Sequence, residues 1–128
     1  MAGKLLADTS VIIDMFTGDE VAQRLMATAE KVRVPSIALG ELFYGAQRSG
    51  REAELKRVNA FAAAASVLSC DLETARRYGE LRNGLRAKGR PIPDNDIWIA
   101  ALGVQHGLTI ATRDSHFREL DGVALLIW

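Results

Sequence analysis

Two carboxylates come directly after short apolar segments of the sequence. Asp8 follows residues 5–7, and Asp114 follows residues 108–113. Brief apolar runs are typical of buried strands, and ligands of open α/β sheets bind outside the carboxyl ends of the strands. The two positions therefore favour a binding site. The alternatives are a helix cap for Asp8 and a simple turn residue for Asp114.

Two further carboxylates lie in segments with a helical pattern. Glu41 lies within the apolar segment 37–46, and a helix that is apolar all round is largely buried. A buried carboxylate is costly unless it is paired or binds a metal, so a core arginine or a narrow exposed stripe is the alternative. Asp96 precedes the apolar segment 97–102. Because Asp94 suits the cap of that helix, Asp96 is left without a structural task.

These four acids, Asp8, Glu41, Asp96 and Asp114, can converge at one edge of a parallel sheet. Clustered carboxylates repel one another unless a cation lies between them. Mg²⁺ and Mn²⁺ are the hard cations that prefer oxygen ligands. Such a site suits hydrolysis of a phosphodiester, because the metal activates water and stabilises the leaving oxygen. We therefore predict that the four acids are both metal ligands and catalytic residues.

The other reactive side chains are few. The chain has one cysteine, Cys70, and two histidines, His106 and His116. A lone cysteine excludes an intrachain disulfide and a cysteine-based zinc site, and we expect Cys70 to be buried at the end of a strand. We expect His106 to be structural at a helix C-terminus. His116 follows Asp114 closely, and the alternatives for it are a phosphate contact and a plain surface residue, of which we favour the surface residue. Because so few reactive side chains are present, we expect an activated water molecule, rather than a side chain of the protein, to be the nucleophile.

Short apolar segments alternate with helical patterns along the chain. Strands are expected over residues 4–7, 32–34, 66–70, 108–111 and 123–127. Helices are expected from a cap at Thr9 or Ser10 to Gly18, over 19–30, 37–47 (capped by Ser36), 51–66 and 72–88 (capped by Asp71), and from Asp94 or Asn95 to His106, which Gly107 follows. This alternation predicts an α/β fold, with a five-stranded parallel sheet flanked by helices. No repeat or linker divides the chain, so we expect one domain over residues 1–128.

Four segments together resemble the PIN-domain family, and within it the VapC-type toxin ribonucleases of bacterial and archaeal toxin–antitoxin pairs. They are residues 5–14, 36–46, 95–101 and 112–117, and each contains one of the four acids. Their order and spacing match across essentially the whole chain. A match in all four segments is far more specific than a match in one.

The resemblance implies a fold, an activity and partners. The family has a five-stranded parallel sheet between helices, and its acids map onto the four named here, which would bind one or two Mg²⁺ or Mn²⁺ ions. Thr9 or Ser10, and Thr112, match hydroxyl positions that often help to bind water or metal. Members cleave RNA endonucleolytically, the toxins are inhibited by a small antitoxin protein, and homodimers are usual. We therefore expect a metal-dependent endoribonuclease toxin of a type II pair.

Other functions stay open at this point. A PIN-like nuclease of RNA maturation, or one that acts on DNA, would carry the same acids. A non-catalytic RNA-binding or metal-binding module would carry them unused. A phosphatase-like hydrolase is disfavoured, because it needs a second aspartate two residues after the first, where this chain has Ser10.

The composition fits one globular domain. Hydrophobic residues make up 48% and charged residues 25% of the 128 residues, which excludes a disordered chain. No segment approaches the ~18 apolar residues of a membrane span, and the first residues do not form a secretion signal. We expect a cytoplasmic protein with no membrane partner, as the single cysteine also suggests.

The charges are unevenly distributed. The 16 basic and 16 acidic residues balance, which by itself disfavours a strongly cationic nucleic-acid binder. Residues 76–90, however, carry six basic side chains and one acidic side chain. Because arginine and lysine bind the phosphates around a cleavage site, a basic helix beside an acidic pocket suits a nuclease. The candidate RNA contacts are Arg82, Arg86, Arg90 and Arg113.

Overall fold

The computed structural model describes residues 3–127; Met1, Ala2 and Trp128 of the predicted domain lie outside the described residues. Within these residues the strands are β1 (Lys4–Ala7), β2 (Lys31–Pro35), β3 (Val67–Leu68), β4 (Thr109–Thr112) and β5 (Leu125–Ile127). They form one sheet in the order β3-β2-β1-β4-β5, and every pairing is parallel. The predicted five-stranded parallel sheet is confirmed.

The two edge strands are shorter than the predicted segments 66–70 and 123–127. β3 pairs only with the end of β2, where Val34 lies opposite Val67 and Pro35 lies opposite Leu68. Because β2 ends at Pro35, residues beyond Leu68 have no strand to pair with.

The helices follow the predicted segments closely. They are α1 (Thr9–Phe16), α2 (Glu20–Thr28), α3 (Ser36–Ser49), α4 (Glu52–Ala64), α5 (Leu72–Lys88), α6 (Asp94–His106) and a 3₁₀ helix, η1 (Ser115–Glu119). Asp71 caps α5 as predicted, with Thr74 completing a capping box. Ser36 is not the cap of α3 but its first residue, because Pro35 occupies the cap position. Within residues 3–127, no helix has the length and apolar character needed to cross a membrane.

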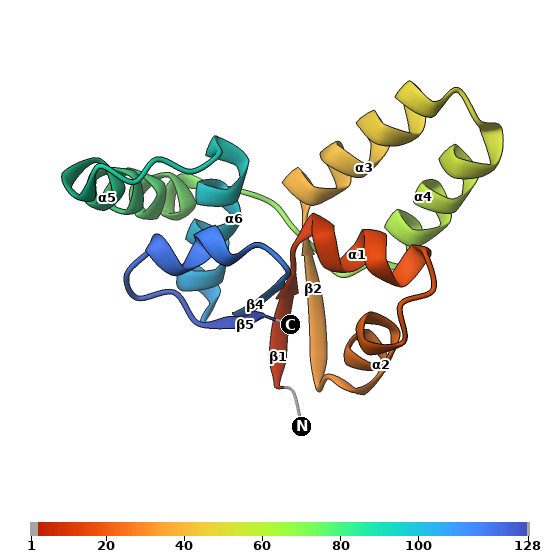
Figure 1. Ribbon diagram of the computed structural model, residues 1–128, viewed down its shortest axis with the longest axis horizontal. Helices are drawn as coiled ribbons and strands as arrows, with labels where there is room; N and C mark the ends of the chain where they lie inside the picture. The colour runs from red at the N-terminus through yellow and green to blue at the C-terminus, as the bar shows by residue number, and fades with distance from the viewer. Residues whose placement is uncertain (1–2, 128) are drawn as a thin grey trace.

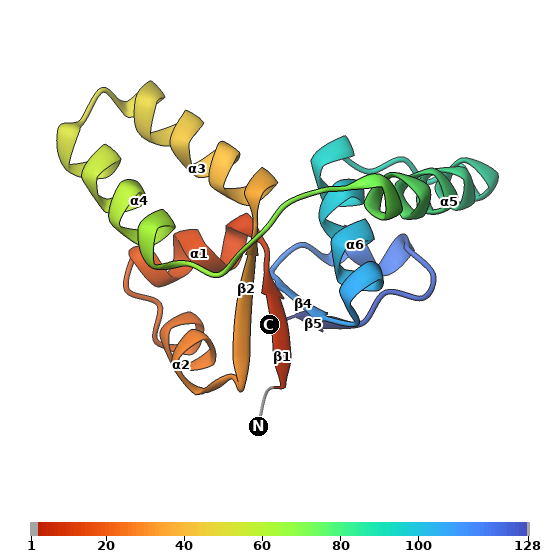
Figure 2. The same ribbon diagram turned by 180° about the vertical axis from the view of Figure 1, so that it is seen from behind.

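Helices cover both faces of the sheet (Figures 1 and 2). Alternate side chains of β1 point to opposite faces. Leu5 and Ala7 belong to an apolar cluster with residues of α1, α3 and α4, whereas Leu6 belongs to a second cluster with residues of α5, α6 and η1, including Phe117. Burial on both faces explains why the strands appear in the sequence as continuous apolar runs.

The strand order places a switch point between β1 and β4. The chain runs from β1 outward to β2 and β3, and then returns to the other side of β1 to form β4 and β5. Figure 1 shows α1, α3 and α6 beginning at the same edge, beyond the carboxyl end of β1. In open α/β sheets this is the edge at which ligands bind.

Candidate metal centre

Asp8 is buried at the end of β1, and its side-chain carboxylate is held by two hydroxyl groups. Its Oδ2 accepts hydrogen bonds from Thr112 Oγ1 at 2.7 Å and from Ser10 Oγ at 3.1 Å. Asp8 occupies the cap position of α1, but among the described residues its side chain accepts no bond from the first turn of that helix. The helix-cap alternative therefore does not account for its carboxylate.

Asp96, Asp114 and His116 form a compact group at the same edge. One ligand atom from each lies within 4.8 Å of the other two, an arrangement that could hold a metal ion. His116 Nε2 lies 2.5 Å from Asp96 Oδ2, and His116 Nδ1 lies 3.9 Å from Asp114 Oδ1. Carboxylate oxygens with one imidazole nitrogen are a donor set that fits a divalent cation.

The surroundings of Asp96 disfavour its charged form. Burial raises the pKa of its carboxyl, the bond with His116 lowers it, and the negative charges of Asp8 and Asp114 raise it further. The net direction is upward. Crowded carboxylates in a partly buried site are the condition that a bound cation relieves.

Glu41 lies on α3 at the edge of the same hollow. Its Oε1 accepts a hydrogen bond of 2.8 Å from Thr9 Oγ1. A hollow of about 440 Å³ is lined by residues that include Glu41, Asp96, Asp114 and His116. The structure therefore brings three of the four predicted acids around one hollow, and Asp8 is connected to it through Thr112, whose Oγ1 accepts the backbone N–H of Asp114 at 3.0 Å.

The prediction that Glu41 lies in a helix buried all round is wrong. Glu41 is half-buried, and Tyr44 on the following turn is 67% exposed. One face of α3 packs against the core through residues such as Leu39 and Leu42, while the other face is open. Glu41 therefore lies beside solvent at the hollow, so burial alone does not account for its position.

Asp94 does not cap α6, so that prediction is also wrong. Pro93 occupies the cap position, and within residues 3–127 no side-chain cap bond is formed. The carboxylate of Asp94 instead accepts hydrogen bonds from Tyr78 Oη at 2.9 Å and from Arg82 Nη1 at 3.3 Å. Two side chains of α5 thus draw Asp94 away from its own helix, and it connects α5 to α6.

Two further residues differ from expectation. His116, predicted to be a plain surface residue, lies in the acidic group because η1 turns it back toward Asp96. Its position two residues after the strand-end acid Asp114 was the available signal in the sequence. Cys70, predicted to be buried, is exposed, because β3 ends at Leu68 and leaves it outside the sheet.

The four candidate arginines divide into two groups. Arg82, Arg86 and Arg90 line one cavity between α5 and α6. Arg113 lies apart at the end of β4, where its Nη1 lies 2.9 Å from Asp14 Oδ2. The structure thus brings three of the four arginines together, whereas Arg113 forms an ion pair with Asp14.

Comparison with known proteins identifies a family. The family model of the PIN domain matches residues 5–123. The chain is 33% identical over 124 residues to Ribonuclease VapC5 of Mycobacterium tuberculosis, covering 91% of this chain and 87% of that protein. It is 29% identical over 129 residues to the tRNA(fMet)-specific endonuclease VapC of Salmonella typhimurium, covering 98% of each.

Solved structures agree with this relationship. The DNA-bound VapBC from Salmonella typhimurium matches with a TM-score of 0.88 and 29% identity, covering 100% of this chain and 99% of that one. VapBC2 from Rickettsia felis, bound to a promoter DNA fragment, matches with a TM-score of 0.87 and 23% identity, covering 98% of both chains. The second match, at lower identity, supports the fold alone.

Proposed function

The chain belongs to the PIN-domain family, with VapC ribonucleases among its relatives, and on this premise we propose that it is a divalent-metal-dependent endoribonuclease acting as the toxin of a type II toxin–antitoxin pair. The observation that carries the proposal is the group of Asp96, Asp114 and His116 at the switch point of the sheet. A group of this kind suits hydrolysis by activated water.

We assign the metal to Asp8, Glu41, Asp96 and Asp114, with His116 as a further ligand, and take the ion to be Mg²⁺ or Mn²⁺. When bound, the ion supplies Lewis-acid stabilisation of the phosphate and lowers the pKa of a water molecule. The chain itself orients the carboxylates. Thr112 and Ser10 fix Asp8, and Thr9 fixes Glu41.

We propose RNA as the substrate and a small antitoxin as the protein partner. Several matching structures are described as toxin–antitoxin complexes or VapBC systems, among them VapBC-5 from Mycobacterium tuberculosis. Arg82, Arg86, Arg90 and Arg113 are the proposed RNA contacts. A homodimer is proposed from the family resemblance. A cytoplasmic location is proposed because the one cysteine of the chain fits a reducing compartment.

Cleavage of an end-labelled RNA by the full chain tests the activity. We expect cleavage with Mg²⁺ or Mn²⁺, none with excess chelator, and none from Asp96→Asn with either metal. Glu30→Gln, which removes an exposed carboxylate beyond α2, is the matched control and keeps full activity. Cleavage in chelator, or full activity of Asp96→Asn, would contradict the proposal.

Expression in a bacterial host tests the toxin role. We expect the wild-type chain to arrest growth and a small protein encoded beside it to relieve the arrest. The Asp96→Asn chain should be harmless at the same expression level. Unimpaired growth with an active wild-type nuclease would favour a role in RNA maturation instead.

A further inference from the structure

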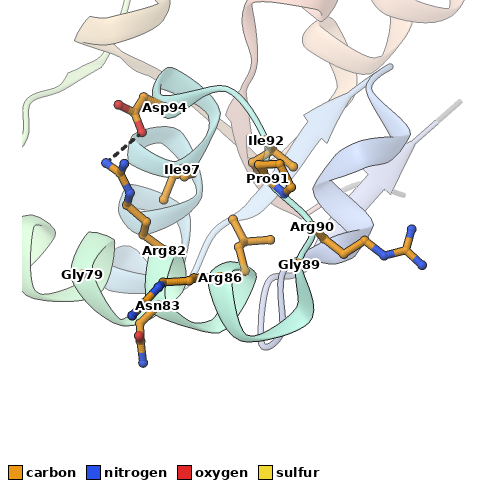
Figure 3. Close-up of a pocket in the computed structure, with 11 residues that line it drawn as sticks. Gly79, Arg82, Asn83, Arg86, Gly89, Arg90, Pro91, Ile92, Asp94 and Ile97 are labelled. Atoms are coloured by element: carbon orange, nitrogen blue, oxygen red, sulfur yellow. Dashed lines mark hydrogen bonds and ion pairs between the residues drawn. The ribbon is translucent and has the colours of Figure 1, made fainter.

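A second cavity lies between α5 and α6, next to the acidic hollow. It has a volume of about 610 Å³, within the range of about 300–1,000 Å³ that is typical of small-molecule sites. We call it the arginine cavity (Figure 3), and its lining residues fall into a polar and an apolar set. The polar set is Arg82, Asn83, Arg86, Arg90 and Asp94; the apolar set is Leu85, Pro91, Ile92 and Ile97, with Gly79 and Gly89.

The charge of this cavity suits an anion. Three arginines face one carboxylate, that of Asp94, so the lining carries a net positive charge. Arg82 is engaged with Asp94 at 3.3 Å, and Arg90 lies 3.8 Å from Glu119. Among the described residues Arg86 has no ion pair, and Figure 3 shows its side chain beside Asn83. Arg86 is therefore the cation most available to a phosphate.

The apolar side of the cavity suits a flat, weakly polar group. Figure 3 shows Ile92 and Pro91 on the loop before α6 and Ile97 on α6. Together with Leu85 of α5 they form an apolar wall of the cavity. A nucleotide combines the two chemistries that this lining offers, because its base buries an apolar face while its phosphate binds a cation.

The arginine cavity also adjoins the proposed metal centre. Asp94 lines both the cavity and the hollow that contains Asp96, Asp114 and His116. We propose that the arginine cavity binds one unpaired ribonucleotide of the RNA substrate, with its base on the apolar wall and its phosphate on Arg86, next to the phosphodiester at the metal centre. This inference rests on the proposed function.

Two glycines of α5 allow a matched test. Gly79 lines the arginine cavity, and Gly84 lines a different cavity beside Leu120. A Cβ atom added at either position has no contact within 4 Å outside the neighbouring backbone of the helix, so both positions open onto space that a side chain can enter. Leucine also favours a helix more than glycine does, so both variants should fold. Gly79→Leu fills the arginine cavity, whereas Gly84→Leu leaves it open.

Binding is measured by fluorescence anisotropy with the full chain, a labelled unstructured oligoribonucleotide and excess chelator, so that no cleavage occurs. We expect Gly79→Leu to bind about tenfold or more weakly, and Gly84→Leu to bind as the wild type does. Equal binding by Gly79→Leu and the wild type would overturn the inference, as would equal weakening in both variants. A wild-type chain that binds no RNA in chelator would also overturn the inference, because none of the four proposed metal-binding acids lines the arginine cavity. The proposed function is tested separately, by the cleavage assay with Mg²⁺ or Mn²⁺.

A charge variant tests the phosphate contact separately. Arg86→Gln should weaken binding and reduce the dependence of log K on log salt by about 0.7, the value for one phosphate of a single strand. Arg76→Gln, on the same helix but outside the cavity, should change neither. Sedimentation of every variant records the oligomeric state. If Gly79→Leu changes only that state, the cavity is an interface between copies of the chain and the inference is wrong.

Discussion

Thr112 joins the carboxyl ends of β4 and β1 by donating a buried hydrogen bond of 2.7 Å to Asp8 Oδ2. The same hydroxyl oxygen accepts the backbone N–H of Asp114 at 3.0 Å. One fully buried side chain therefore fixes the carboxylate of Asp8 and the backbone of Asp114 across the switch point. Ligands that are oriented in this way need little rearrangement when a cation binds.

Replacing Thr112 by valine should weaken metal binding and also lower the stability of the metal-free fold. Valine has a similar shape but no hydroxyl, so Asp8 loses a charge-assisted bond worth about 1.5–3 kcal/mol. We expect the affinity for Mn²⁺ to fall by about tenfold or more, as for other groups that orient metal ligands. Calorimetric titration with Mn²⁺ measures the affinity, and urea unfolding measures the stability.

The hydroxyl can be restored at the same position. Thr112→Ser keeps the donor and loses only a methyl group, so its Mn²⁺ affinity should stay close to the wild-type value. Equal Mn²⁺ affinity in Thr112→Val and the wild type would mean that Asp8 needs no such support.

Residues at the strand ends could be placed from the sequence alone. β1 and β4 are each four residues long, and the last three residues of each are buried, so the apolar run shows where the strand stops. Because every strand is parallel, residues that follow a strand all reach the same edge of the sheet. The convergence of Asp8 and Asp114 therefore followed from local pattern.

Contacts between distant segments could not be predicted in the same way. The partners of Asp94 come from the preceding helix, and the contact of His116 with Asp96 depends on how η1 turns. The exposure of Cys70 depends on the length of β2, which the segment around Cys70 does not encode. These features depend on tertiary packing, for which a single sequence contains no periodic signal.

A divalent cation should stabilise the folded protein. Only the folded chain brings the carboxylates together, so Mn²⁺ at about 100 times its dissociation constant should add about 2.7 kcal/mol. In thermal unfolding, Tm should rise when Mn²⁺ is added. Adding chelator afterwards should reverse this rise. Asp96→Asn should lose most of this rise, and Glu30→Gln should keep it. A Tm that does not respond to Mn²⁺ would argue against a metal centre.

The titration of Asp96 should make both the stability of the protein and its metal binding depend on pH. Burial, together with the charges of Asp8 and Asp114, raises the pKa of Asp96 in the folded chain above its ordinary value of about 3.9. At a pH between these two pKa values, Asp96 keeps its proton in the folded chain and has lost it in the unfolded chain. The stability of the metal-free protein therefore falls as pH rises through this window.

Proton and metal compete for the same carboxylate. The affinity for the metal therefore changes with pH in the opposite direction to the stability of the metal-free protein. Mn²⁺ affinity should fall as pH is lowered through the raised pKa of Asp96. Titrations from neutral toward acidic pH measure this fall, and urea unfolding without metal measures the stability slope. In Asp96→Asn that slope should flatten. An unchanged slope would assign the titration to another group.

His116 should bias the site toward Mn²⁺. Its imidazole places a nitrogen beside two carboxylates, and Mg²⁺ accepts nitrogen ligands less readily than transition-metal ions do. His116→Asn should therefore lower the ratio of Mn²⁺ to Mg²⁺ affinity by about tenfold, as measured by calorimetry and by the spin-resonance signal of free Mn²⁺. His106→Asn, in the exposed last turn of α6, should leave the ratio unchanged. Equal ratios in His116→Asn and the wild type would show that the imidazole only orients Asp96.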